Sequence, residues 1–220
     1  MNPAYWIGYS LSRIVGSVFF DYRAEGSENI PLTGPAVLAV NHQSYLDPPL
    51  SGIATKRDCC FLARKTLLDI PIMGPILPRL NVIPVSKDGA DMSALKIVIR
   101  ELKKDQLVLL FPEGTRSLDG KLQPAQAGIG LILAKSGAPV VPMRIFGSFQ
   151  AWGKGSKGIT PRPITVVAGR PIQFGPADFE GDARIAYQAA ADRVLEAIRQ
   201  LRPSPDRMRW HRDDPGLIEG

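Results

Sequence analysis

Residues 91–111 read DMSALKIVIRELKKDQLVLLF and contain two different apolar patterns in succession. In the first part, apolar side chains recur at intervals of three and four, which places them on one face of a helix over residues 91–104. This face comprises Met92, Leu95, Ile99 and Leu102. The next run, residues 106–111, is short and almost continuously apolar, as in a buried strand. The stretch therefore predicts a helix followed by an inner strand of a sheet.

The same alternation extends along most of the chain. Further helical patterns cover residues 126–136, which end before Gly137, and residues 182–201, which end before Pro203. The other predicted strands are residues 36–40, 59–63, 82–85, 140–145 and 164–168. Strands that alternate with helices indicate an α/β domain, in which functional groups gather beyond the carboxyl ends of strands.

The length and charge of the chain restrict its class. A chain of 220 residues fits one domain with a full core. The net charge of +6 and the pI near 9.5 indicate an anionic partner, namely nucleic acid, a membrane surface or a phosphorylated substrate. Because the chain has no long Lys/Arg run and no aromatic–basic interleaving, we expect no nucleic-acid partner.

The two cysteines, Cys59 and Cys60, are adjacent and lie in an apolar run. Adjacent cysteines do not have zinc-site spacing and rarely form a disulfide with each other, so we expect buried strand residues in a reducing cytoplasm. Two distant histidines add no metal site, and we expect no metal. The segment 203–220 is polar and contains prolines, so it is predicted to be a peripheral tail in which His211 is solvated.

The N-terminal residues 4–20 are mostly apolar, but Arg13 interrupts them and no signal-peptide features flank them. Their length is marginal for crossing a bilayer. On a helix, one apolar face comprises Ile7, Leu11, Ile14 and Val18, and a narrow polar stripe comprises Ser10, Arg13 and Ser17. Trp6, Tyr5 and Tyr9 favour a headgroup boundary. We therefore favour an amphipathic helix in the membrane interface over a helix packed on the domain, with a true span least favoured.

The first motif, residues 41–47, reads NHQSYLD and follows a predicted strand. Neutral imidazole can accept a proton near pH 7, and a carboxylate can hold the ring in one tautomer. His42 and Asp47 are five positions apart, so they meet only if a turn leads into a helix at this point. The alternative interpretation is an Asn/His cap with a helix-starting Asp47.

The second motif, residues 111–117, reads FPEGTRS and also follows a predicted strand. Gly114 permits a positive φ or a close backbone approach. Arg116 offers a planar fork to phosphate oxygens, and Thr115 with nearby N–H groups adds donors. The alternative interpretation is a charged turn with an internal pair between Glu113 and Arg116.

Together, the two motifs in this order resemble the signature of the glycerolipid acyltransferase family, which includes lysophosphatidic acid acyltransferases. The resemblance covers roughly residues 31–169. It implies an α/β domain over residues 31–202 with a mixed central sheet flanked by helices. Residues 1–30 would be the membrane-interfacial helix and its linker.

The resemblance also implies the chemistry. His42 would act as general base on an acceptor hydroxyl and Asp47 would orient it. The acyl donor would be an acyl-CoA or acyl-carrier-protein thioester, with no further cofactor. Backbone N–H groups near the His42 turn or the Gly114 turn would stabilise the oxyanion. The product from 1-acylglycerol 3-phosphate would be phosphatidic acid, made at the cytoplasmic face of the cell membrane by a peripheral or monotopic protein.

Substrate contacts carry over to several positions. The turn supplies Glu113, Gly114, Thr115 and Arg116. Lys87 stands where the family usually has arginine. Lys65 belongs to the stretch 63–65, which resembles a family segment whose lysine approaches the substrate phosphate. Pro142, in the apolar strand, would shape the pocket wall. Residues 122–128 depart from a Phe-Lys-x-Gly run found in many relatives.

Three alternatives remain at the level of sequence. The first is acylation of another acceptor, such as glycerol 3-phosphate or a different lysolipid. The second is a membrane lipid-binding protein without catalysis, against which the intact motifs argue. The third, a nucleic-acid binder, rests on the charge alone.

Overall fold

The computed structural model describes residues 3–71, 74–85 and 92–217. Its centre is a seven-stranded sheet in the order β1-β7-β6-β2-β5-β3-β4. The strands are β1 (Arg23–Glu25), β2 (Ala36–Val40), β3 (Cys59–Arg64), β4 (Val82–Val85), β5 (Leu107–Leu110), β6 (Val140–Phe146) and β7 (Thr165–Ala168). All neighbouring strands are parallel except β6 and β7, which are antiparallel. The predicted mixed sheet is thus confirmed.

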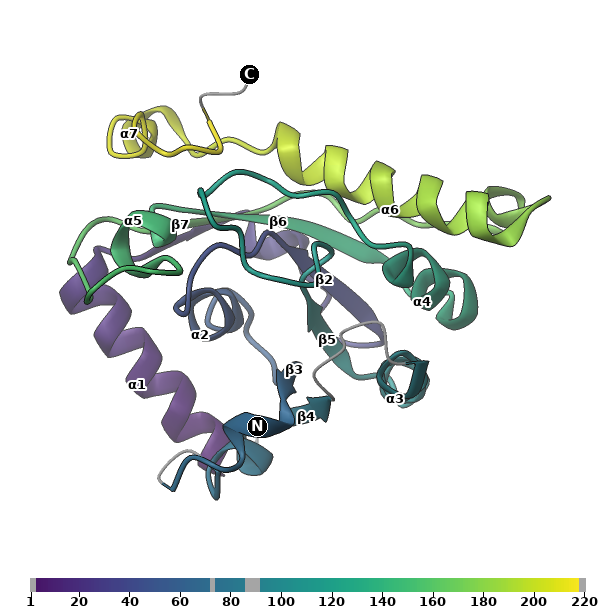
Figure 1. Cartoon of the computed structure of the whole chain (residues 1–220), viewed down its shortest axis with the longest axis horizontal. Coiled ribbons are helices and arrows are strands. Elements are labelled where there is room, and N and C mark those ends of the chain that lie inside the picture. The colour runs from purple at the N-terminus through teal and green to yellow at the C-terminus, as the bar shows by residue number, and fades with distance from the viewer. Residues whose placement is uncertain (1–2, 72–73, 86–91, 218–220) are drawn as a thin grey trace.

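Helices cover both faces of this sheet (Figure 1). One face packs against α3 (Met92–Leu102), α4 (Gly128–Ser136) and α6 (Ala183–Gln200). The other face packs against α1 (Pro3–Phe20), α2 (Asp47–Gly52) and α5 (Ser148–Trp152). A last short helix, α7 (Pro205–Met208), follows α6. Single 3-10 turns occur at Ser27–Asn29, Lys65–Leu67, Leu77–Leu80 and Pro176–Phe179.

The central strands have both faces buried because helices lie on each side. Along β2, Val37 points into the core beneath α3, α4 and α6, whereas Leu38 points into the core beneath α1 and α2. In β5, Val108 and Leu109 divide in the same way. This explains why the inner strands read as continuous apolar runs rather than alternating ones.

The predicted strands agree with β2 to β7 to within about two residues at each end. Cys59 and Cys60 are free and buried in β3, as expected, and burial raises the pKa of the Cys59 thiol to about 12. The predictions missed β1, whose residues Arg23, Ala24 and Glu25 have no strand-like apolar pattern. They also missed α5 and α7, which are only five and four residues long.

Helix α1 packs on the domain and also has an exposed apolar face. Its inner side packs on the domain through Tyr5, Gly16 and Phe20. The predicted apolar face points outward, and its four side chains are 59–70% exposed. This exposed face comprises Ile7, Leu11, Ile14 and Val18. Among the described residues, we find no helix that is both long and apolar enough to span a bilayer.

The prediction that His211 is solvated is wrong, because His211 is 0% exposed. Its Nε2 lies 2.8 Å from Oγ1 of Thr165 in β7, which also accepts a hydrogen bond from Arg207 Nε at 3.1 Å. Arg207 forms an ion pair with Asp21, just after α1. Within the tail, Arg207, His211 and Asp214 are buried and pair with polar groups of the domain, so the polarity of these three residues did not indicate exposure.

Candidate active site

The two motifs lie side by side because β2 and β5 are adjacent parallel strands. The chain leaves β2 at Val40 and β5 at Leu110, and both motifs therefore extend from the same edge of the sheet. A hydrogen bond from Ser117 N to His42 O, 2.8 Å long, joins them. This is the edge at which functional groups were expected.

His42 and Asp47 are in contact, as the family resemblance implied. Nδ1 of His42 lies 2.9 Å from Oδ2 of Asp47, and the His42 side chain is 17% exposed whereas that of Asp47 is 0% exposed. The pair meets because the chain turns after β2 and Asp47 begins α2. The same Oδ2 atom accepts hydrogen bonds from the backbone N–H groups of Gln43 and Ser44, both at 2.6 Å.

The His42 ring is further held by the second motif. It stacks on Phe111, with ring centroids 3.9 Å apart and an interplanar angle of 17°. The backbone N–H of His42 donates to Oε1 of Glu113 at 2.8 Å, and Gln123 N donates to Oε2 at 3.1 Å. With one ring nitrogen bound to Asp47, the Nε2 atom remains to exchange a proton with a substrate.

Glu113 links the turns of the site rather than facing its cavity. It is 3% exposed, and burial raises its pKa to about 7 despite the two backbone hydrogen bonds, which act in the opposite direction. The internal Glu113–Arg116 pair considered from sequence does not occur among the ion pairs of the described residues. The carboxylate therefore fixes the position of the His42 backbone.

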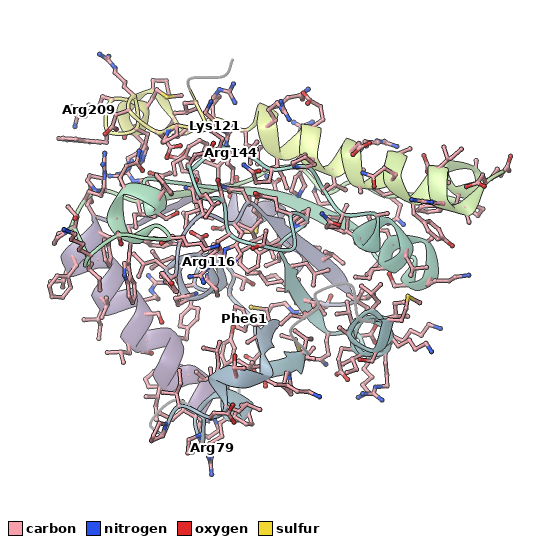
Figure 2. All side chains as sticks on the ribbon, viewed as in Figure 1. Phe61, Arg79, Arg116, Lys121, Arg144 and Arg209 are labelled. Atoms are coloured by element: carbon pink, nitrogen blue, oxygen red, sulfur yellow. The ribbon has the colours of Figure 1, made fainter. Side chains whose placement is uncertain are left out.

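Arg116 belongs to a stack of flat side chains beside the dyad. Its guanidinium carbon lies 3.6 Å from the centroid of the Tyr45 ring, and Tyr45 in turn contacts Trp152 with centroids 5.0 Å apart. The Nη1 atom of Arg116 is buried and makes no hydrogen bond within the described part of the chain. In the view of Figure 2, Arg116 lies near the middle of the molecule, whereas Arg79 lies at its lower edge.

A cavity of about 320 Å³ opens at this arginine. The residues that line it are Thr115, Arg116, Ser117, Leu118, Asp119, Gln123 and Lys154. Arg116 and Lys154 bring two positive charges to the cavity, and Asp119 is bound to Ser117 Oγ at 2.8 Å. A buried, unsatisfied guanidinium N–H beside a second cation is suited to an anionic group such as phosphate.

The other predicted substrate residues are placed in different ways. Gly114 has a φ of 70°, the left-handed conformation expected for it. Lys65 is exposed and follows β3, whose carboxyl end lies at the same sheet edge. Pro142 lies within β6 and pairs with Ala39, one residue before the end of β2. Lys87 lies outside the described residues.

Sequence reasoning missed two residues of the site. Ser148, at the start of α5, donates a hydrogen bond from Oγ to Oδ1 of Asp47 at 2.7 Å. Lys154 follows Gly153, which forms a bridge with Ser44, and Trp152 O accepts a hydrogen bond from Ser44 Oγ at 2.8 Å. Both residues lie in a segment far in sequence from the two motifs. The only local signal for this segment is the pair Gly147-Ser148, which follows a predicted strand.

Within the described residues, no group of three or more His, Cys, Asp or Glu side chains could hold a metal ion. Glu113 is a further acidic neighbour of Asp47, and both of its oxygens accept backbone N–H groups.

Comparisons with known proteins agree with this arrangement. The sequence model of the family described as "Acyltransferase" matches residues 21–146. A 1-acyl-sn-glycerol-3-phosphate acyltransferase of Pseudomonas aeruginosa is 31% identical over 94% of this chain and 79% of its own length. A chloroplastic enzyme of the same name from Arabidopsis thaliana is 34% identical over 73% of this chain. The match spans about half the length of that plant relative, 46%.

A solved acyltransferase structure has the same fold. The crystal structure of the 1-acyl-sn-glycerophosphate (LPA) acyltransferase PlsC from Thermotoga maritima superposes with a TM-score of 0.73 and 27% identity, covering 91% of this chain and 81% of that one. The fold and the two motifs are those of the acyltransferase family. The chain belongs to the glycerolipid acyltransferase family, whose members compared above are 1-acyl-sn-glycerol-3-phosphate acyltransferases.

Proposed function

We propose that this protein transfers a fatty acyl group from an acyl-CoA or acyl-carrier-protein thioester to the free hydroxyl of 1-acylglycerol 3-phosphate, which yields phosphatidic acid. The observation that carries the proposal is the His42–Asp47 contact at 2.9 Å, next to a cavity lined by Arg116. A base beside a cavity lined by Arg116 and Lys154 fits an acceptor that has both a hydroxyl and a phosphate. The names of the relatives support the same acceptor.

In this reaction His42 Nε2 removes the proton of the acceptor hydroxyl as its oxygen attacks the thioester carbonyl carbon. A C–O bond forms, and the C–S bond then breaks. The departing thiolate takes the proton back from the imidazolium, so the protein ends unchanged. Asp47 receives the Nδ1–H hydrogen bond throughout and stabilises the transient positive charge. No acyl-enzyme is needed, because the hydroxyl attacks the donor directly.

The oxyanion would be stabilised at the second motif rather than the first. The backbone N–H groups of His42, Gln43 and Ser44 are all occupied by the carboxylates of Glu113 and Asp47. By contrast, the N–H groups of Thr115 and Arg116 make no hydrogen bond to any part of the chain that the structure describes. We assign oxyanion binding to this turn, where such donors contribute about 3–4 kcal/mol each.

The acceptor phosphate would bind in the cavity between Arg116 and Lys154. Stacking on Tyr45 holds the guanidinium plane, and the buried Nη1 atom gains its missing acceptor from a phosphate oxygen. Lys154, which follows α5, adds a second positive charge to the cavity. Lys65, exposed at the same sheet edge, stays a candidate for the acceptor or the donor phosphates.

Helix α1 would attach the protein to the cytoplasmic face of the membrane as a peripheral or monotopic protein. Its outward face presents four large apolar side chains, and Trp6 beside them is 57% exposed.

Deletion of the helix would also remove Tyr5 and Phe20 from the core, so substitution of exposed positions is the cleaner test of membrane attachment. A double change, Leu11→Glu with Ile14→Glu, should abolish flotation with anionic vesicles, whereas Ile185→Glu on α6 should not. Equal flotation of the two variants would reject this attachment.

The test of the proposed reaction is detection of phosphatidic acid from oleoyl-CoA, or oleoyl-acyl-carrier protein, and 1-acylglycerol 3-phosphate. Glycerol 3-phosphate and lysophosphatidylcholine serve as competing acceptors. A preference for 1-acylglycerol 3-phosphate is the expected result. Preferred acylation of another acceptor would change the substrate but keep the chemistry. Lipid binding without any product, from every donor and acceptor, would favour the non-catalytic alternative.

A further inference from the structure

Asp47 has two carboxylate oxygens, and only one of them faces His42. Oδ2 accepts hydrogen bonds from the His42 ring and from two backbone N–H groups. Oδ1 accepts from the hydroxyl of Ser148, at 2.7 Å. Both residues are fully buried. The second oxygen of the orienting carboxylate is therefore occupied by a single side chain from another part of the fold.

The direction of this hydrogen bond follows from the donors around it. The Nε2 group of Gln43 has two hydrogens, which point to Ile145 O at 3.0 Å and to Ser148 Oγ at 3.0 Å. Ile145 O is a carbonyl and can only accept, which fixes the amide nitrogen of Gln43 on this side. Because Ser148 Oγ accepts from Gln43, its own hydrogen is available for Asp47. The hydroxyl thus donates to the ionised carboxylate.

The main chain places Ser148 tightly. The residue follows Gly147, whose φ of 80° and the 2.4 Å approach of Pro163 O to a hypothetical Cβ leave room only for glycine. Gly147 N donates to Asp214 Oδ2 at 2.8 Å, so the C-terminal segment holds the start of α5. Ala151 of the same helix is buried in the core against the sheet. Ser148 is therefore fixed from both sides of its position in the chain.

We propose that Ser148 is a positioning residue for acyl transfer, which holds Asp47 ionised and oriented toward Nδ1 of His42. The assignment rests on the proposed function of the His42–Asp47 dyad as the base. A hydroxyl that donates to the dyad disfavours its protonation, because it stabilises the charged carboxylate. Without this donor, the dyad takes up its proton at a higher pH.

The experiment uses full-length protein whose histidine rings are isotopically labelled with nitrogen, and the ring nitrogens are followed by NMR as the pH is changed. The chain has only two histidines, so the His42 signals are readily assigned by comparison with a His211→Asn variant. In Ser148→Ala, the His42 titration should move to higher pH by about one unit, as expected from loss of one hydrogen bond to a charged group. In Ser148→Thr, which keeps the hydroxyl, the midpoint should return toward the wild-type value.

Two other charged groups near the dyad are Glu113, on the turn after β5, and Arg116, above Tyr45. Neither changes in these variants, and reading the ring nitrogens directly separates His42 from Glu113. The matched control is Ser51→Ala, since Ser51 is also fully buried, lies on α2 and has a hydroxyl that makes no hydrogen bond within the described residues. Its substitution should leave the His42 titration unchanged.

Kinetics give the second measurement. Ser148→Ala should lower kcat about tenfold with the acceptor KM unchanged, and the acidic limb of kcat/KM should move with the NMR titration. If Ser148→Ala does not fold, Ser148→Cys fills the space with a weak donor and should shift the titration in the same direction. An unshifted His42 titration in a folded variant would overturn the proposal. A wild type inactive on 1-acylglycerol 3-phosphate would instead reject the proposed substrate, because the titration needs no substrate.

Discussion

The two histidines of this chain lie in opposite environments. His42 has a carboxylate on one ring nitrogen, an aromatic ring on one face and a partly exposed side chain at the edge of the sheet. His211 is fully buried, and its Nε2 meets the hydroxyl of Thr165 while Nδ1 has no partner within the described residues. Burial, with the nearby charge of Arg207, lowers the pKa of His211 to about 4.

The difference shows what distinguishes a general base from a structural histidine. A base needs an acidic partner to stabilise its charged form and a second nitrogen that substrate can reach. His42 has both, and His211 has neither. Composition alone treats the two residues alike, so the contrast comes entirely from tertiary contacts.

The largest effect should come from removing the acidic partner. Asp47→Asn keeps the shape of the side chain but presents an amide to Nδ1, which favours the wrong tautomer of His42. We expect kcat to fall by about a thousandfold or more, as in other His–Asp pairs. Thermal unfolding measured in parallel serves as the control for folding. Activity within tenfold of wild type would show that Asp47 is not the orienting group.

The second prediction concerns His211 and stability. Because its pKa is about 4 when folded and near 6.5 when unfolded, the unfolded chain binds more protons between these values. The contribution is fully present above pH 6.5 and is lost as pH falls toward 4, by up to about 3 kcal/mol. Urea unfolding of wild type and His211→Asn between pH 4 and 7 measures this. The same pH dependence in both proteins would contradict the burial of a neutral imidazole.

The third prediction concerns the anion site. Arg116→Lys loses the planar fork and the stacking on Tyr45, and we expect kcat/KM for the acceptor to fall tenfold or more.

The fourth prediction concerns the second cation of this site. Lys154→Ala should raise the acceptor KM about tenfold with kcat little changed, the scale of one charge-assisted hydrogen bond. Lys157→Ala, an exposed lysine of the same loop, is the matched control. Equal kinetics for the two lysine variants would exclude Lys154 from the site.

Short-range sequence patterns predicted the inner strands, the end of α4 and the positions of the two motifs. The apolar runs of β2 and β5 are buried on both faces, and Gly137 ends α4 with a φ of 66°. The two motifs were recognisable because each follows directly from a strand end. The family resemblance added the pairing of His42 with Asp47, for which five-residue spacing alone was weak.

The missed features depend on contacts between distant residues. Ser148 is separated from Asp47 by 101 positions, and nothing in its neighbouring sequence marks a link to the dyad. Strand β1 forms because Arg23 N donates to Ile164 O beside β7, not because its side chains favour a strand. His211 was misinterpreted because polar side chains can satisfy one another in the interior, and composition does not distinguish this from solvation.

The measurement that tests the central claim most directly is acyl transfer from a long-chain acyl-CoA to 1-acylglycerol 3-phosphate by wild type, His42→Ala and His211→Asn. The account predicts that His42→Ala reduces turnover at least about a hundredfold, the scale of losing a general base. It predicts that His211→Asn, assayed at pH 7.5 and a temperature where it is folded, retains most of its activity. Full activity in His42→Ala would contradict the account.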